Sequence, residues 1–171
     1  MERKYNISTA YKAIASASYI FSDGVNTKQQ RGFISADVEF VNYRGVRFSK
    51  SNENGDNLKD YYKSLNNTTK EIYKGNVNIK VGGELKFNSY AFRLGTAYYG
   101  SPYQDDNIKA DKFIVSGGIG YRKNGMFIDL SMSQTIVNDV QFPYRLSDVA
   151  NTYAVQKGNA QTVVMTIGFK L

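Results

Sequence analysis

Residues 75–87 alternate polar and apolar side chains at every position, and this feature restricts the fold more than any other in the chain. The odd-numbered positions hold apolar residues or glycine, namely Val77, Ile79, Val81, Gly83, Leu85 and Phe87. The even-numbered positions hold polar residues or glycine, among them Lys80, Glu84 and Lys86. A period of two places successive side chains on opposite faces of a strand. The segment is therefore predicted to be a β-strand with one apolar face and one charged face.

The next run, residues 90–99, alternates in the same way, and Asn88-Ser89 between the two runs predicts a two-residue turn. The cross-strand pairs that this turn predicts are Phe87–Tyr90, Leu85–Phe92 and Ile79–Tyr98. Every apolar position then meets an apolar position on one face, which supports an antiparallel hairpin.

Five further runs alternate along the chain, at residues 11–21, 32–43, 112–122, 126–136 and 161–171. Asn124-Gly125 is the strongest short hairpin signal among the connections. We expect an all-β, antiparallel, up-and-down arrangement of seven or eight strands, each of about ten residues.

Three observations favour a transmembrane β-barrel segment. Soluble strands average about 5–6 residues, whereas a tilted membrane strand needs about 9–11. Long connections (44–74, 100–111 and 137–160) alternate with two-residue turns, as in outer-membrane barrels with long outer loops and short inner turns. The polar faces carry charged side chains, as expected of strands that line a water-filled lumen. A soluble sandwich with its apolar face inside has the same alternation and remains the alternative.

Composition excludes several kinds of function. The chain has 171 residues and no cysteine or histidine, so it lacks thiol nucleophiles, thiolate zinc sites and the commonest general base. We find no catalytic constellation and expect neither an enzyme, nor a cofactor, nor a metal site. The formal net charge is +7, but the basic residues are scattered, so no nucleic-acid partner is expected. No apolar stretch is long enough for a transmembrane helix.

The segment Leu94-Gly95-Thr96-Ala97-Tyr98-Tyr99-Gly100-Ser101-Pro102-Tyr103 resembles a stretch of the long-chain fatty-acid transporter (FadL/TodX) family, in particular its branch often labelled hemin receptor. Further similar segments follow in family order: residues 5–9, 36–43, 81–84, 117–122 and 166–169. Together they span residues 1–171 and are similar to the C-terminal part of that family.

The resemblance implies a bacterial outer-membrane barrel of fourteen strands that passively transports hydrophobic compounds such as long-chain fatty acids. Its partners would be outer-membrane lipid, a hydrophobic small-molecule ligand and the barrel-insertion machinery. The family's N-terminal plug and first strands have no counterpart here, so we expect residues 1–171 to form a single segment of a larger barrel. The absence of an apolar leader at the N-terminus is expected of a mature form or a fragment.

Loop 44–74 contains a candidate ligand groove. Leu58, Tyr61, Tyr62 and Leu65 have the i, i+3, i+4, i+7 spacing of a short amphipathic helix, for which Asp56 or Asn57 is a candidate cap. This helix either forms an apolar entry groove for a lipid-like ligand or packs on the barrel rim for stability.

Charged residues of the polar faces form a second candidate site. They either line a conduit or neutralise one another as ion pairs, because buried charges need partners. The set is Lys80, Glu84, Lys86, Arg93 and Asp129. Lys80 and Arg93 are the candidates for binding a carboxylate. The nearby glycines 117, 118 and 120 are expected to allow close packing of the lumen backbone rather than to bind a nucleotide.

Two other hypotheses remain open. The first is a small barrel that serves as an anchor or adhesion module, with residues 1–10 as its eighth strand. The second is a soluble β protein that holds an apolar ligand inside, as lipocalins do.

Overall fold

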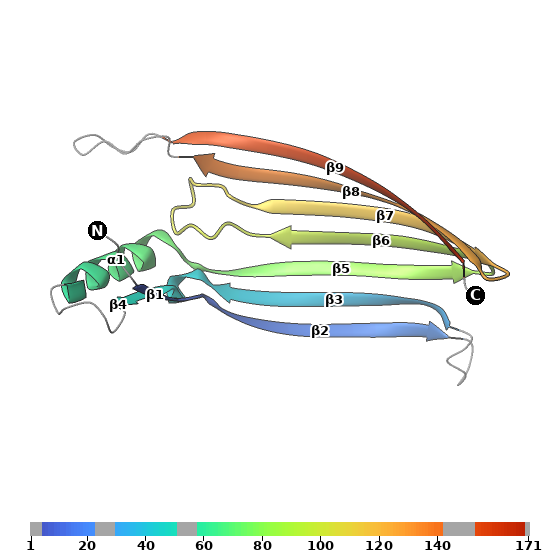
Figure 1. The fold of residues 1–171 in the computed structure, drawn as a ribbon, viewed down its shortest axis with the longest axis horizontal. Helices are drawn as coiled ribbons and strands as arrows, with labels where there is room; N and C mark the ends of the chain where they lie inside the picture. Colours follow the sequence, from blue (N-terminus) through green and yellow to red (C-terminus); the bar gives the residue numbers. More distant parts are fainter. Residues whose placement is uncertain (1–4, 23–29, 51–57, 142–152, 170–171) are drawn as a thin grey trace.

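The computed structural model describes residues 5–22, 30–50, 58–141 and 153–169. Most of them form one antiparallel sheet in which seven strands lie side by side in chain order (Figure 1). These strands are β2 (Tyr11–Ser22), β3 (Gln30–Asn42), β5 (Gly75–Phe87), β6 (Tyr90–Tyr99), β7 (Lys112–Lys123), β8 (Met126–Gln141) and β9 (Ala154–Phe169). The predicted all-β, antiparallel, up-and-down fold is therefore confirmed.

The register of the β5–β6 hairpin agrees with the sequence prediction pair for pair. Phe87 lies opposite Tyr90, Leu85 opposite Phe92 and Ile79 opposite Tyr98. The β7–β8 hairpin turns at Asn124-Gly125, whose φ angles of 50° and 80° are the positive values that a tight hairpin turn uses.

A small second layer lies beyond one end of the sheet. The strands β1 (Tyr5–Ser8) and β4 (Arg47–Lys50) pair with each other, and α1 (Lys59–Ile72) lies beside them (Figure 1). A single 3₁₀ turn, η2 (Tyr43–Gly45), joins β3 to this layer. The hypothesis that residues 1–10 supply an eighth strand of the main sheet is wrong for Tyr5–Ser8, because β4 is the strand that pairs with them.

The last two strands are longer than expected. Each has 16 residues, so the connection between them spans 142–153 instead of 137–160. Residues 137–141 lack a clear apolar face, and they extend β8 because residues 154–158 of β9 pair with them. The long connections 44–74, 100–111 and 142–153 still leave the sheet at the end that carries α1, which we call the helix end. The turns at 88–89 and 124–125 lie at the opposite, turn end.

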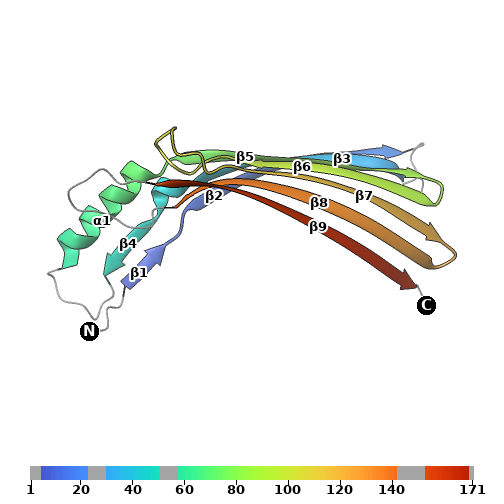
Figure 2. The same cartoon turned by 90° about the horizontal axis from the view of Figure 1, so that it is seen from above.

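The sheet is curved and open. Figure 2 shows β8 and β9 curling away from the plane of β3 and β5. Among the described residues, β2 and β9 are the two edges, and no pairing joins them. A row of small residues crosses all seven strands on the polar face and leaves room for this curvature; it consists of Ser18, Ser35, Gly82, Gly95, Ser116, Ser133 and Thr162.

The two faces of the sheet differ in how their side chains are covered. The apolar face is exposed on every strand, with Leu94 at 76% and Phe87 at 60%. Within the described part of the chain only Val41, Tyr62, Ala91 and Val140 are buried apolar residues. The sheet therefore has no hydrophobic core of its own, and its largest apolar surface lacks a covering layer. No helix in the described ranges is long and apolar enough to cross a membrane.

Candidate functional site

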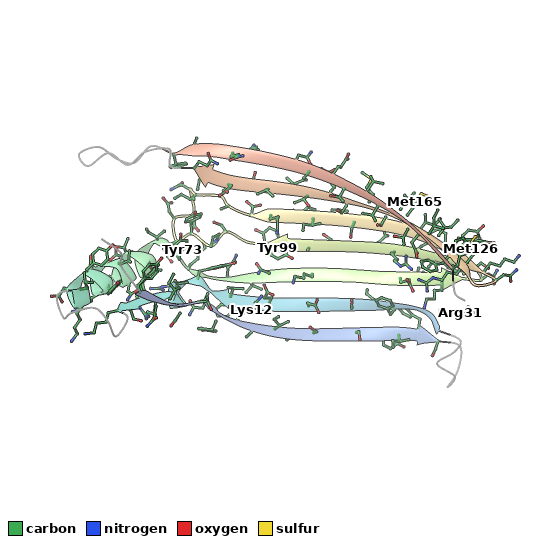
Figure 3. All side chains as sticks on the ribbon, viewed as in Figure 1. Lys12, Arg31, Tyr73, Tyr99, Met126 and Met165 are labelled. Atoms are coloured by element: carbon green, nitrogen blue, oxygen red, sulfur yellow. The ribbon has the colours of Figure 1, made fainter. Side chains whose placement is uncertain are left out.

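The charged residues of the polar face gather into two groups (Figure 3, in which Lys12 and Tyr99 lie toward the helix end and Arg31 and Met126 at the turn end). The turn-end cluster consists of Glu84, Lys86, Arg93, Arg122 and Asp129. The helix-end cluster consists of Lys12, Glu39, Asn78, Lys80, Tyr99 and Lys112. Each cluster combines residues from several strands, so the sheet register assembles it.

Arg93 is the centre of the turn-end cluster. Its Nε donates to Glu84 Oε2 at 2.5 Å, and its Nη1 donates to Asp129 Oδ1 at 2.7 Å. Lys86 Nζ lies 3.3 Å from the other Glu84 oxygen, and Arg122 lies 3.8 Å from Asp129. Two carboxylates are thus held by three cations, and the expected network of ion pairs is present.

Gly120 provides the space that Arg93 and Asp129 need. It lies opposite both Ala91 and Asp129 in the sheet. A Cβ atom at Gly120 would lie 3.3 Å from Arg93 Nη1 and in direct collision with Asp129 Oδ1. The glycine is therefore part of the site because it lacks a side chain.

Glu39 is the centre of the helix-end cluster. It is 6% exposed and accepts a 2.8 Å hydrogen bond from Asn78 Nδ2. Two ammonium groups approach its Oε2 atom, that of Lys12 at 3.4 Å and that of Lys80 at 3.8 Å. A buried carboxylate needs such partners, since an unpaired charge at this depth would be strongly destabilising.

Tyr99 links this cluster to the next strands. Lys112 Nζ lies 4.3 Å from the centroid of the Tyr99 ring, and Lys80 Nζ lies 5.5 Å from it, both within cation–π distance. A shallow hollow of about 230 Å³ lies between the two clusters, lined by the charged residues Asp37 and Lys80 together with small residues that include Gly82, Gly95 and Ser116. The polar face thus combines two charged regions with a central strip that large side chains leave open.

The candidate groove residues of loop 44–74 lie on α1 or at its start. Tyr62 is buried, and Leu58 and Leu65 are half-buried, whereas Tyr61 is 53% exposed and packs edge-to-face on Tyr62 at 5.5 Å. Leu58 occupies the N-cap position without a side-chain cap, and the candidate caps Asp56 and Asn57 lie outside the described residues.

One side of α1 is fastened to the small sheet. The Asn66 side chain accepts from the backbone N–H of Phe48 at 2.7 Å and donates to its carbonyl oxygen at 2.9 Å. The amide group of Asn66 therefore satisfies the free edge of β4 as a neighbouring strand would. The buried side of the helix fits rim packing, and the exposed Tyr61 is the part that a ligand could reach.

The loop 100–111 is joined to the segment that follows α1. Tyr73 and Tyr103 stack with centroids 5.5 Å apart, and Lys74 N donates to the Pro102 carbonyl at 2.8 Å. The Lys74 ammonium donates to Asp106 Oδ1 at 2.8 Å and lowers the pKa of that carboxyl. Burial raises the pKa of the Tyr103 hydroxyl, with smaller contributions from Tyr73 and Asp139. We call these four residues, Tyr73, Lys74, Tyr103 and Asp106, the loop clamp.

Within the described ranges, no group of three or more acidic side chains is arranged to hold a metal ion. Comparison with protein-family models, with curated proteins and with solved structures finds no match to this chain.

Sequence reasoning named several members of these sites but not their partners. Lys80 and Arg93 lie in different clusters, so the two carboxylate-binding candidates are not brought together. Glu39, Asn78 and Tyr99 were missed as members of one site. The β5–β6 register could have revealed part of it, because it places Asn78 opposite Tyr99.

Proposed function

We propose that this chain forms part of the wall of a transmembrane β-barrel in a bacterial outer membrane, and that the barrel passively passes hydrophobic compounds such as long-chain fatty acids. The observation that carries the proposal is the apolar face, which is exposed on all seven strands while the opposite face holds the ion-pair clusters. A barrel wall has this distribution, with lipid on one side and a polar lumen on the other.

Aromatic residues at both ends of the apolar face support a membrane location. Tyr90, Tyr121 and Phe87 lie side by side at the turn end, and Tyr98 pairs with Phe113 toward the helix end. The eight steps from Tyr90 to Tyr98 extend about 26 Å along the strand at ~3.3 Å per residue. A tilt of about 35–45° reduces this to about 19–22 Å across the membrane, comparable to the apolar band of about 25 Å in outer-membrane barrels. Tyrosine and phenylalanine at these two levels suit the aromatic girdles at the two interfaces.

The free edges indicate how the wall is completed. Because seven antiparallel strands lie in chain order, β2 and β9 run in the same direction and cannot pair with each other in antiparallel fashion. Unpaired edges are not tolerated in hydrocarbon. We therefore expect an odd number of further strands, antiparallel to both edges, to close the barrel.

The polar face suggests what the lumen does. The two clusters hold three carboxylates and six cations, so they carry a net positive charge, and the central strip of small residues leaves space beside them. A passage for an apolar compound that carries a carboxylate, such as a fatty acid, fits this arrangement. The choice of long-chain fatty acids as cargo rests on the resemblance of residues 94–103 to the fatty-acid transporter family.

Two measurements test the proposal in order. Cell fractionation with boiled and unboiled samples should place the protein in the outer membrane as a heat-modifiable band. A strain lacking only this gene should then take up labelled fatty acids, other apolar compounds or heme more slowly, and the intact gene should restore uptake. A soluble protein would refute the membrane location, and normal uptake of all three would refute the transport function alone.

A further inference from the structure

The apolar face contains a groove of about 580 Å³ that the proposed transport does not use. Its floor is Gly83 on β5, where no side chain fills the space between Ile34 on β3 and Leu94 on β6. Other apolar side chains of the same face form the walls of this groove, which we call the Gly83 groove: Phe21, Val81, Leu85, Phe92 and Val115.

The groove offers no hydrogen bond to an occupant. The lining backbone groups belong to the ladders between β3, β5, β6 and β7, where the strands pair without a break. The one side-chain hydroxyl on this face of the groove, that of Thr96, donates to the Ile114 carbonyl oxygen at 3.1 Å. A peptide strand would leave its own backbone groups unpaired there, so the occupant must be wholly apolar.

The width of the groove excludes a helix. Ile34 and Leu94 lie on strands two spacings apart, so their backbones are separated by about 9–10 Å, and their side chains narrow the gap further. An α-helix with its side chains is about 10–12 Å across. A single unbranched alkyl chain fits, because it is narrow and needs no hydrogen bonds.

The depth of the groove matches a lipid tail. Gly83 lies four residues from Phe87 at the turn-end girdle, about 13 Å at ~3.3 Å per residue. Half the hydrocarbon core of a bilayer is about 15 Å. With a strand tilt of about 35–45°, this corresponds to a depth of about 9–11 Å. A lipid whose headgroup lies at this girdle would therefore place the distal half of its tail over Gly83.

We propose that the Gly83 groove binds one acyl tail of a phospholipid from the leaflet on the turn side of the membrane. This inference rests on the proposed membrane location, because only a bilayer would present such a tail to this face.

The test uses the complete protein in vesicles of a phospholipid that carries a photoreactive diazirine in the distal half of one acyl chain. After illumination, peptides containing residues 81–85 and 92–96 should carry at least three times the label found on Val163 and Met165 of β9, although these two residues are more exposed than Val81, Leu85 and Phe92. A Val81→Phe change fills the groove and should reduce that labelling at least threefold.

Val77→Phe is the matched control, since Val77 lies on the same strand and face but outside the groove. It should leave the labelling unchanged, and a heat-modifiable band should show that both variants fold. Even labelling over all strands in a membrane-inserted protein, or a photoproduct with a second polypeptide, would overturn this inference alone. A protein that does not enter membranes would instead overturn the proposed function on which the inference rests.

Discussion

At the scale of residues, the turn-end cluster depends on a glycine, Gly120, whose lack of a side chain leaves room for the ion pair. Gly120 lies against the contact between Arg93 and Asp129, and Asp129 Oδ1 must move if the residue gains a Cβ atom, whereas Arg93 must move only slightly. Gly117, on the same strand but the opposite face, is different. A Cβ atom there would make only ordinary contacts, at 3.5 Å to Leu94 and 3.8 Å to the Arg93 carbonyl.

We therefore expect Gly120→Ala to break the Arg93–Asp129 pair and to lower the free energy of unfolding by about 1–3 kcal/mol, the range for a hydrogen bond to a charged group. Gly117→Ala should stay within about 0.5 kcal/mol of the parent protein. Urea unfolding in detergent micelles measures both changes. Equal effects of the two substitutions would show that the ion pair does not depend on Gly120.

At the scale of elements, α1 has one side that packs and one that does not. Tyr62 is 7% exposed, whereas its neighbour Tyr61 is 53% exposed. These two tyrosines separate the two hypotheses for the helix, since one reports on rim packing and the other on a ligand.

Tyr62→Ala should lower stability by about 2–4 kcal/mol, because it removes a buried aromatic ring. Tyr61→Ala should lower stability by only about 0.5–1.5 kcal/mol, through loss of its edge-to-face contact with Tyr62. Measured together with the uptake of labelled fatty acid, an uptake defect in Tyr61→Ala while the protein stays folded would support an entry groove. Normal uptake by that variant would leave rim packing as the role of α1.

The loop clamp is expected to respond to acid. The pKa of Asp106 is lowered in the folded protein, so its ionised form stabilises the clamp. That contribution is fully present above the ordinary aspartate pKa of about 4 and is lost as the pH falls through the lower, folded value. The group is exposed, so the effect on the whole protein is small and local.

Hydrogen exchange at the Lys74 backbone amide, which donates to Pro102, measures this effect. Asp106→Asn should reduce protection of that amide at pH 7, and by a smaller factor at pH 2, because the carboxyl becomes protonated as the pH falls through its lowered pKa; both values are corrected for intrinsic exchange rates. Lys109→Met, a nearby loop change that leaves the clamp intact, serves as the control. An equal loss of protection at both pH values would argue against the ion pair as the cause.

At the scale of the whole molecule, the exposed apolar face is the feature whose effect on stability depends most on the surrounding solvent. In water, a face that includes Leu94 at 76% exposure and Phe169 at 70% would be destabilising and prone to association. In a bilayer the same face is the favoured surface.

The substitution Leu94→Arg tests whether this face contacts lipid or water. Near the bilayer midplane an arginine on the lipid-facing side costs about 2–4 kcal/mol, whereas in water the change should stay within about 0.5 kcal/mol. Ser131→Arg is the control, because Ser131 is exposed on the polar face of β8. Refolding yield and unfolding free energy in lipid vesicles should fall for Leu94→Arg only; equal behaviour of the two variants would contradict a lipid-facing surface.

The local sequence pattern was sufficient to predict much of the sheet. The turns at Asn88-Ser89 and Asn124-Gly125 and the pairing of Phe87 with Tyr90 follow from side-chain alternation and turn chemistry, which act over a few residues. The part of β8 at the helix end could not be predicted in this way. Val137 pairs with both β7 and β9, whereas β9 alone pairs with residues 138–141. Asn138 is further held by Asp111 through a 2.9 Å backbone hydrogen bond.

Side-chain alternation alone predicts long antiparallel strands with one apolar and one charged face, because a period of two separates side chains regardless of what lies beyond the strand. Three features emerge only from the folded sheet: which charges meet, the pairing of β1 with β4, and the groove over Gly83. These features depend on residues distant in sequence that become neighbours through strand order and register. Alternation specifies on which face of its own strand a side chain lies, whereas a contact between two side chains also depends on the position of a second strand.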